Sequence, residues 1–171
     1  MELGGVRMPG MRVNGAKELI RTLEKLGEDT ETMCQKSLYE GAGIVADNMK
    51  SQIQGLKTSS TKYVSEGKKR YLTEEEKKGL LDSLGIAPQQ IKGTVIDTKT
   101  GFDGYNKRKT KKHPAGQPNL AVARTCDRGN SFMYAQPIFR PVIQKSRAAV
   151  LKATKEELLK EMKERGIKVG G

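Results

Sequence analysis

Tryptophan is absent from this chain of 171 residues, cysteine occurs twice, and histidine occurs once. Cys34, Cys126 and His113 are too few for a tetrahedral structural zinc site without carboxylates, and two cysteines provide no disulfide framework. No apolar run approaches the roughly 18–20 residues that would cross a bilayer. Residues 1–11 have no apolar block of the kind found in signal peptides. We therefore expect no metal or other cofactor, no membrane contact, and assembly in a reducing cytoplasm.

Aromatic residues are also scarce, at 5%, and hydrophobic residues make up 35% of the chain. This apolar content is low for the length, so long helices, flexible loops and burial completed by a partner subunit are expected. The length suits one domain and hardly two. We predict a flexible arm at 1–14, a single domain over 15–166 with mobile loops near 56–72 and 106–117, and a flexible tail at 167–171.

Apolar residues recur at three- and four-residue steps over much of the chain, which predicts amphipathic helices. Thr73 and Glu76 have the spacing of a capping box, so one helix should begin there and end at Gly85. Gly41 and Gly43 lie inside the longest pattern, where they weaken the helix or permit close packing. The other expected helices cover residues 16–26, 30–53, 118–127 and 141–165. The residues expected to form the buried stripe of the 30–53 helix are Met33, Leu38, Ala42, Val45, Met49 and Ile53.

Residues 91–98 are rich in β-branched side chains, and residues 102–106 form a second extended candidate. The three residues 99–101 between them include a glycine, which favours a hairpin. Residues 137–141 are expected to form an extended corner. Together the elements predict an α+β fold in which a small antiparallel sheet packs against long amphipathic helices.

Residues suited to catalysis are few. Cys126 lies near Arg124 and Arg128, whose charges would lower its pKa, but no partner base is visible. Acidic residues 74–76 are explained by the dipole at the start of a helix. Residues 101–104 lack the ending of a phosphate-binding loop. We expect no enzymatic activity, and an enzyme that uses Cys126 remains the weakest of three hypotheses.

Positive charge is abundant by contrast: 32 basic residues against 20 acidic ones give a net charge of +12. The densest run of basic residues, at 107–112, could neutralise phosphates or face an acidic partner, although a solvated loop would have the same sequence. No zinc finger, basic heptad helix or aromatic-rich RNA-binding signature accompanies it. The candidate contacts to a DNA channel or an acidic partner are Lys107, Arg108, Lys109, Lys111 and Lys112.

Three segments in order carry a family resemblance. The first is Gly-Leu-Leu-Asp-Ser-Leu-Gly at 79–85, and the second is Thr-Gly-Phe-Asp-Gly-Tyr-Asn at 100–106. The third runs from Pro118 through Gly129-Asn-Ser-Phe to Gln-Pro-Ile-Phe-Arg-Pro at 136–141. Together they resemble the gene-product-ten-like minor tail component family of long-tailed bacteriophages. The motif or interface residues that this resemblance indicates are Gly101, Asp103, Tyr105, Gln136, Pro137, Phe139 and Arg140.

The resemblance implies a structural virion protein of the phage neck, a tail-completion or head–tail joining subunit. It implies a ring around the DNA channel, hexameric by the family's symmetry, between head-closure (stopper) and tail-terminator or tail-tube proteins. The ring would assemble in the host cytoplasm and contact packaged DNA without sequence preference. Phe139 is expected to pack internally, and Arg140 to contact a neighbouring subunit. The alternative hypothesis is a basic accessory protein that binds nucleic acid without sequence specificity.

Overall fold

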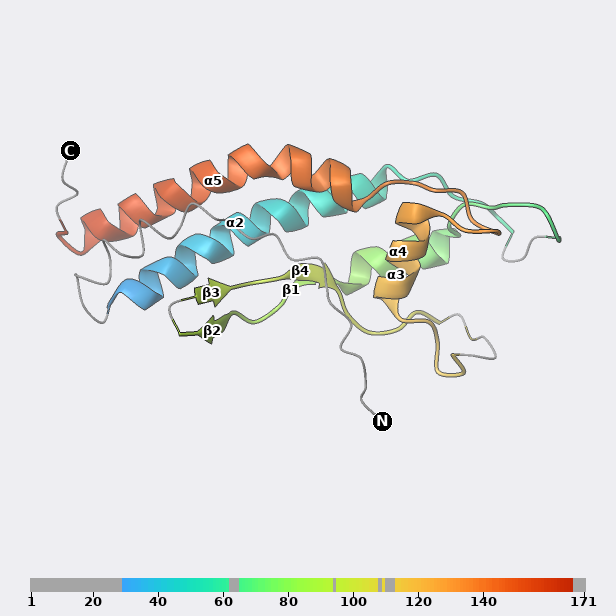
Figure 1. Cartoon of the computed structure of the whole chain (residues 1–171), viewed down its shortest axis with the longest axis horizontal. Helices are drawn as coiled ribbons and strands as arrows, with labels where there is room; N and C mark the ends of the chain where they lie inside the picture. Colours follow the sequence, from blue (N-terminus) through green and yellow to red (C-terminus); the bar gives the residue numbers. More distant parts are fainter. Residues whose placement is uncertain (1–28, 62–64, 94, 108, 110–112, 168–171) are drawn as a thin grey trace. The chain divides into compact units, whose positions relative to one another are not determined.

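The structure is a computed structural model that describes residues 29–61, 65–93, 95–107, 109 and 113–167 (Figure 1). The predicted arm at 1–14, the predicted helix at 16–26 and residues 168–171 lie outside this part of the chain. Helices and two small antiparallel sheets confirm the α+β class. The helices are α2 (Asp29–Gln54), α3 (Glu74–Ser83), α4 (Asn119–Arg128) and α5 (Phe139–Glu164), and the strands are β1 (Leu84–Ile86), β2 (Gln90–Lys92), β3 (Val95–Asp97) and β4 (Thr100–Phe102).

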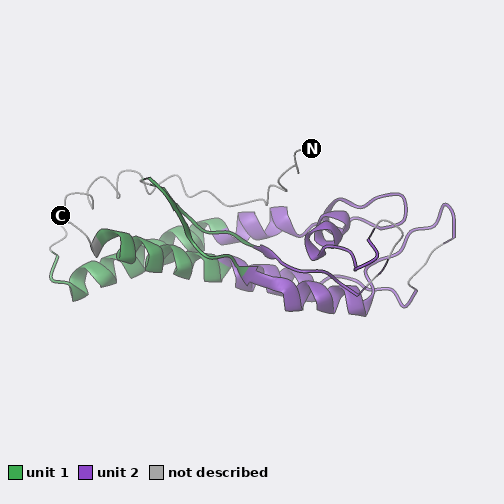
Figure 2. Cartoon of the chain, turned by 90° about the horizontal axis from the view of Figure 1, so that it is seen from below, with its two compact units in different colours: residues 1–44, 86–100, 147–171 green, residues 45–85, 101–146 purple. Residues whose placement is uncertain are grey.

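Contacts divide the chain into two compact units, which Figure 2 shows in separate colours. Unit 1 consists of residues 1–44, 86–100 and 147–171, and unit 2 consists of residues 45–85 and 101–146. The single domain over 15–166 therefore stays a prediction. No described helix is long and apolar enough to cross a membrane.

The core of unit 1 contains Met33 from α2 together with Leu158 and Met162 from α5. Beside it, the Lys36 ammonium donates a hydrogen bond of 2.7 Å to Glu161. This hydrogen bond is the main reason that the pKa of Glu161 lies below its ordinary value. The pair therefore stabilises the fold above the ordinary pKa of a glutamate, and the contribution is lost as the pH falls through the lowered value.

The strand pairing differs from the predicted hairpin of 91–98 with 102–106. Strands β2 and β3 pair with each other, with Ile91 opposite Ile96, so the β-branched run folds back on itself. Gly93, with a φ of +61°, lies where the chain reverses. Strand β4 pairs instead with β1, and it ends at Phe102. The predicted strand at 102–106 is therefore wrong except for Phe102, and Thr100 and Gly101 of the predicted loop belong to β4. The turn at Gly93 was missed because residues 91–98 looked like one continuous extended segment.

In unit 2 the capping box at the start of α3 is confirmed. The Thr73 hydroxyl accepts a hydrogen bond from the Glu76 amide, and the Glu76 carboxylate accepts one from the Thr73 amide. Helix α3 ends at Ser83, and strand β1 follows at once. Helix α4 confirms the expected element at 118–127 with its bounds moved by one residue.

Helix α5 begins at Phe139, so the predicted extended corner at 137–141 is wrong for its last three residues. The Asp127 carboxylate accepts hydrogen bonds from the amides of Ile138 and Phe139, at 2.6 and 3.0 Å, and caps the helix. Pro141 lies in the first turn, where an amide would have no partner within the helix. The proline therefore continues the helix instead of delaying its start.

The segment near 56–72, predicted as a mobile loop, contains buried residues. Leu56 and Leu72 are buried, and the Ser59 amide donates to the Leu72 carbonyl at 2.7 Å. The predicted stripe of α2 is confirmed for most of its members, Met49 and Ile53 included. Leu38 is the exception, because it is half-buried.

Two glycines of α2 provide a matched test of packing in unit 1. A Cβ atom at Gly41 would lie 2.7 Å from Thr154 Oγ1 and 3.1 Å from Val150 Cγ1, whereas a Cβ atom at Gly43 would meet nothing within 4 Å. Close packing therefore requires glycine at position 41 and not at position 43.

We predict opposite effects of alanine at these positions on the free energy of unfolding. Gly43→Ala should raise it by up to about 1 kcal/mol, because alanine is the better helix former. Gly41→Ala should lower it by about 1–3 kcal/mol through overpacking. Urea denaturation followed by circular dichroism measures both, and a stabilised Gly41→Ala variant would contradict the packing.

Candidate partner and DNA interfaces

The basic loop, residues 107–115, is closed at its base by backbone contacts. The Asn106 amide donates to the Gln117 carbonyl at 2.9 Å, and the Gln117 amide donates to Asn106 Oδ1 at 3.1 Å. Gly116 has a φ of +116°, and a Cβ atom there would lie 2.0 Å from the Asn106 carbonyl oxygen. The base of the loop thus holds the two ends of the loop close together and requires a glycine.

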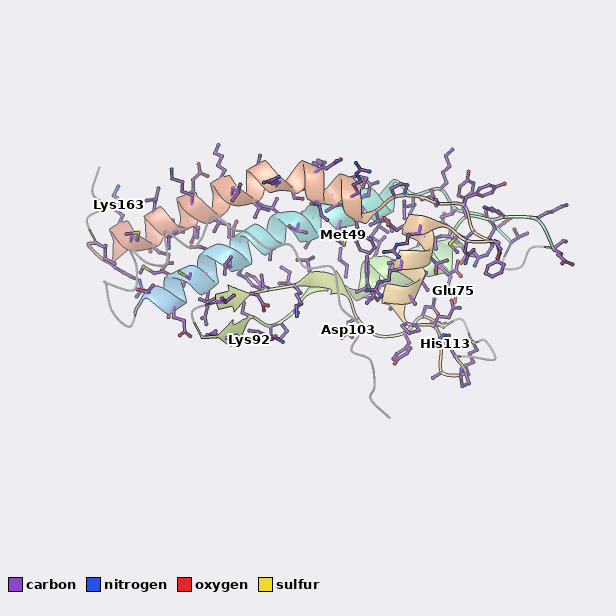
Figure 3. All side chains as sticks on the ribbon, viewed as in Figure 1. Met49, Glu75, Lys92, Asp103, His113 and Lys163 are labelled. Carbon is purple, nitrogen blue, oxygen red and sulfur yellow. The ribbon has the colours of Figure 1, made fainter. Side chains whose placement is uncertain are left out.

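Of the predicted cationic contacts, Lys107 and Lys109 are described, and both are exposed. Arg108, Lys111 and Lys112 lie outside the described residues. His113 is half-buried, and its carbonyl accepts a hydrogen bond from the Gly116 amide at 3.1 Å. Figure 3 labels His113 beside the described part of the loop.

The motif residues of the second segment lie where β4 leads into this loop. Gly101 is half-buried within β4, and Asp103 and Tyr105 are exposed. Asp103 Oδ1 accepts a hydrogen bond from the Gly104 amide, and its carbonyl accepts one from the Asn119 side chain. Asp103 therefore shapes the turn, while Tyr105, with 66% of its surface exposed, is available for contact.

The third motif segment also contains both residues with a structural role and residues exposed for contact. The Gln136 side chain forms hydrogen bonds with both backbone groups of Lys57. Its Oε1 accepts from the Lys57 amide at 2.7 Å, and its Nε2 donates to the Lys57 carbonyl at 3.0 Å. The Phe139 ring packs edge-on against the ring of Phe102, with centroids 6.4 Å apart. Pro137 and Arg140 are exposed. The structure thus brings Phe139 against β4 and leaves Arg140 at the surface.

A tight turn precedes that segment. Gly129, with a φ of +71°, ends α4, and a Cβ atom there would lie 2.8 Å from the Ala135 amide nitrogen. The Asn130 side chain accepts hydrogen bonds from the amides of Phe132 and Met133. This turn buries Met133 and leaves Phe132 exposed.

The turn presents an aromatic patch, which we define as Lys57, Tyr71, Phe132 and Tyr134. The rings of Tyr71 and Tyr134 lie 5.0 Å apart, and the Lys57 ammonium lies 5.9 Å from the centre of the Tyr71 ring. Phe132 exposes 59% of its surface and Tyr134 45%. Exposed aromatic groups of this kind are typical of contact surfaces. Sequence reasoning missed the patch because Tyr71 and Tyr134 come together only through the fold.

A buried ion pair supports the patch from beneath. The Arg70 guanidinium donates two hydrogen bonds to the Glu76 carboxylate, at 2.6 and 2.7 Å, and both residues are buried. The Arg70 backbone amide donates to the Phe132 carbonyl, and its carbonyl accepts from the Tyr134 amide. One residue therefore connects the start of α3 with the segment that carries the patch.

Arg70→Met should lower the free energy of unfolding by about 3–5 kcal/mol, because it removes the guanidinium that forms two hydrogen bonds with the buried Glu76 carboxylate. Adding Glu76→Gln to that variant should restore much of the loss, since glutamine also completes a capping box. Thermal and urea unfolding measure both variants. A double variant less stable than Arg70→Met would contradict this account.

Cys126, the nucleophile of the enzyme hypothesis, is fully buried. Burial, assisted by the negative charge of Asp127, raises the pKa of its thiol to about 12, although a hydrogen bond with the Gln136 side chain opposes the shift. The expected lowering by Arg124 and Arg128 is therefore wrong in direction. Burial also raises the pKa of Cys34. Among the described residues, no three His, Cys, Asp or Glu side chains gather to hold a metal ion.

In a Cys34→Ser variant, we expect Cys126 to resist thiol reagents at pH 8 until the protein unfolds. A pKa near 12 leaves only about one thiol in 10⁴ ionised at that pH. Labelling with and without urea, followed by mass spectrometry, measures the reaction. Rapid stoichiometric labelling of the folded variant would support the enzyme hypothesis instead.

The family model described as "Bacteriophage HK97-gp10, putative tail-component" matches residues 17–116. The chain belongs to this family. No curated protein and no solved structure matches it significantly. Membership of the HK97 gp10-like family confirms the resemblance, and it makes the chain a phage tail component that acts with other virion proteins.

The matched range contains some candidate site residues and excludes others. Gly101, Asp103, Tyr105 and the basic loop up to residue 115 lie within it. Gln136 to Arg140 and all of α5 lie beyond it. A family of structural tail components indicates a role in assembly rather than in catalysis.

Proposed function

We propose that the chain is a tail-completion or head–tail joining subunit of the phage neck. It forms a ring, hexameric by the family's symmetry, between head-closure and tail-terminator or tail-tube proteins. The HK97 gp10-like family match over residues 17–116 carries this proposal. In the ring, each subunit uses one surface against the next, because a heterologous contact that closes generates a cyclic assembly.

The aromatic patch supports the protein contacts that such a ring requires. Large aromatic side chains dominate the binding energy of interfaces once they are desolvated. Phe132 and Tyr134 are exposed on a backbone that hydrogen bonds to Arg70 hold in place. A surface fixed before assembly loses little conformational entropy when a partner covers it. Arg140, exposed at the start of α5, is proposed as a further contact with the neighbouring subunit.

The charge distribution supports a position beside DNA. Unit 2 contains 17 of the 32 basic residues and 8 of the 20 acidic ones, so it carries +9 of the net charge of +12. Its basic loop projects Lys107 and Lys109 into solvent. Contacts between lysine and phosphate do not depend on base sequence, so they suit a channel through which any sequence passes. The same charge favours the second candidate, a basic accessory protein that binds nucleic acid outside the virion.

Deleting the gene from its phage should separate these candidates. A joining subunit is required for assembly, so the lysate should contain DNA-filled heads and tails that are not joined. Complementation from a plasmid should restore joined particles, and purified particles should contain the chain. Normal particles without the chain would contradict the neck assignment and leave the accessory protein.

Replacing Lys107, Arg108, Lys109, Lys111 and Lys112 by serine tests the basic loop. Folding should be unchanged, because Lys107 and Lys109 are exposed and substitutions at exposed positions usually alter stability by no more than about 0.5 kcal/mol. DNA retention in filled heads, or the yield of joined particles, should fall, because the loop no longer neutralises phosphates. The matched control replaces five other exposed lysines by serine: Lys50, Lys68, Lys69, Lys78 and Lys92. If phage that carry either variant are as infectious as phage with the natural protein, the basic loop does not act on packaged DNA.

A further inference from the structure

Helix α5 carries an unusual run of charge. From Phe139 to Lys155 it contains five basic residues and no acidic one, whereas residues 156–164 contain four acidic residues and two lysines. Most surface helices mix both signs, because pairs of opposite charge one turn apart stabilise the helix. Residues 139–155 of α5 contain no acidic residue, so no such pair forms within them. The residues concerned are Arg140, Lys145, Arg147, Lys152 and Lys155.

All five basic side chains are exposed. At about 100° per residue, they occupy one half of the helix circumference, and buried Val142, Ser146 and Val150 occupy the other half. Lys152 lies 3.8 Å from Glu156, and both side chains are largely in solvent, so this ion pair neutralises little. Figure 3 shows side chains with nitrogen at their tips projecting from α5 into solvent.

The partner of this basic half of α5 is inferred from charge complementarity. Lys145 and Lys155 are ten residues apart, which corresponds to about 15 Å of helix. Duplex DNA carries one phosphate charge per about 1.7 Å of its axis, so a duplex segment of this length carries about nine phosphates on its two strands. A density of negative charge that recurs along every duplex, whatever its base sequence, is matched by the exposed arginines and lysines of this half of the helix. A phosphate backbone fits it best.

We propose that the cationic surface of α5, formed by Lys145, Arg147, Lys152 and Lys155, binds the phosphate backbone of duplex DNA. It is a second DNA-binding surface, separate in sequence from the basic loop and beyond the range matched by the family model. The inference rests on the proposed function, because a neck ring places its subunits around the DNA path. It assigns to α5 the role of a rigid surface against the DNA.

The experiment measures binding of the purified full-length chain to a 30-base-pair duplex by fluorescence anisotropy across a range of salt concentrations. The test variant replaces Lys145, Arg147, Lys152 and Lys155 by glutamine. Its affinity should fall at least about tenfold near 0.1 M salt, and the salt slope should decrease by about 0.9 for each phosphate that the variant no longer neutralises. Circular dichroism confirms that the variant is folded.

The control variant replaces exposed Lys50, Lys68, Lys69 and Lys78 by glutamine, which changes the net charge equally. Its affinity should fall by about threefold or less. An equal decrease in both variants would overturn the proposal, because net charge alone would explain it. Unchanged DNA binding by the α5 variant, together with weaker binding to polyglutamate, would instead identify a surface for an acidic protein. Neither result depends on whether heads and tails join, so failure here is distinct from failure of the neck assignment.

Discussion

The buried pair of Arg70 and Glu76 organises unit 2. Its two hydrogen bonds join a segment without regular structure to the first turn of α3. The backbone of Arg70 then holds the segment that carries Phe132 and Tyr134. A buried ion pair is costly to desolvate, so its hydrogen-bonding groups need partners. The Thr73 amide donates to the Glu76 carboxylate, and the Arg70 guanidinium also donates to the Tyr71 carbonyl. The aromatic patch depends on this pair for its position.

The surfaces of the chain divide between two kinds of partner. The aromatic patch suits a protein neighbour, whereas the basic loop and the first part of α5 suit a polyanion. Both kinds are expected of a subunit that contacts other virion proteins and, as we propose, surrounds DNA. The closed base of the loop, with Gly116 against Asn106, lets positive charge project without disturbing the packing beneath it.

Local signals made the helices predictable from sequence. The capping box of Thr73 and Glu76 is complete within four residues, and Gly129 ends α4 through its own conformation. The start of α5 was missed because its cap, Asp127, lies twelve residues before Phe139. The strand pairing was missed for the same reason, since the partner of β4 lies before the hairpin and not beside it. Interactions between distant segments leave no periodic trace in a sequence.

The candidate site likewise contains features that a local sequence signal predicts and features that depend on distant segments. The charge of the basic loop is visible in a run of six residues, and the structure places two of its members, Lys107 and Lys109, in solvent. The patch is invisible in sequence because Tyr71 and Tyr134 meet through pairing around Arg70. The direction of the pKa shift of Cys126 was also hidden from sequence, because burial has the largest effect on it and not the neighbouring arginines.

Electron cryomicroscopy of the intact phage, focused on the junction of head and tail, tests the central claim most directly. The account predicts a closed ring of this chain at the junction, with the basic loop and the first part of α5 facing the DNA. Density for the chain at the distal end of the tail, or none in the particle, would contradict it.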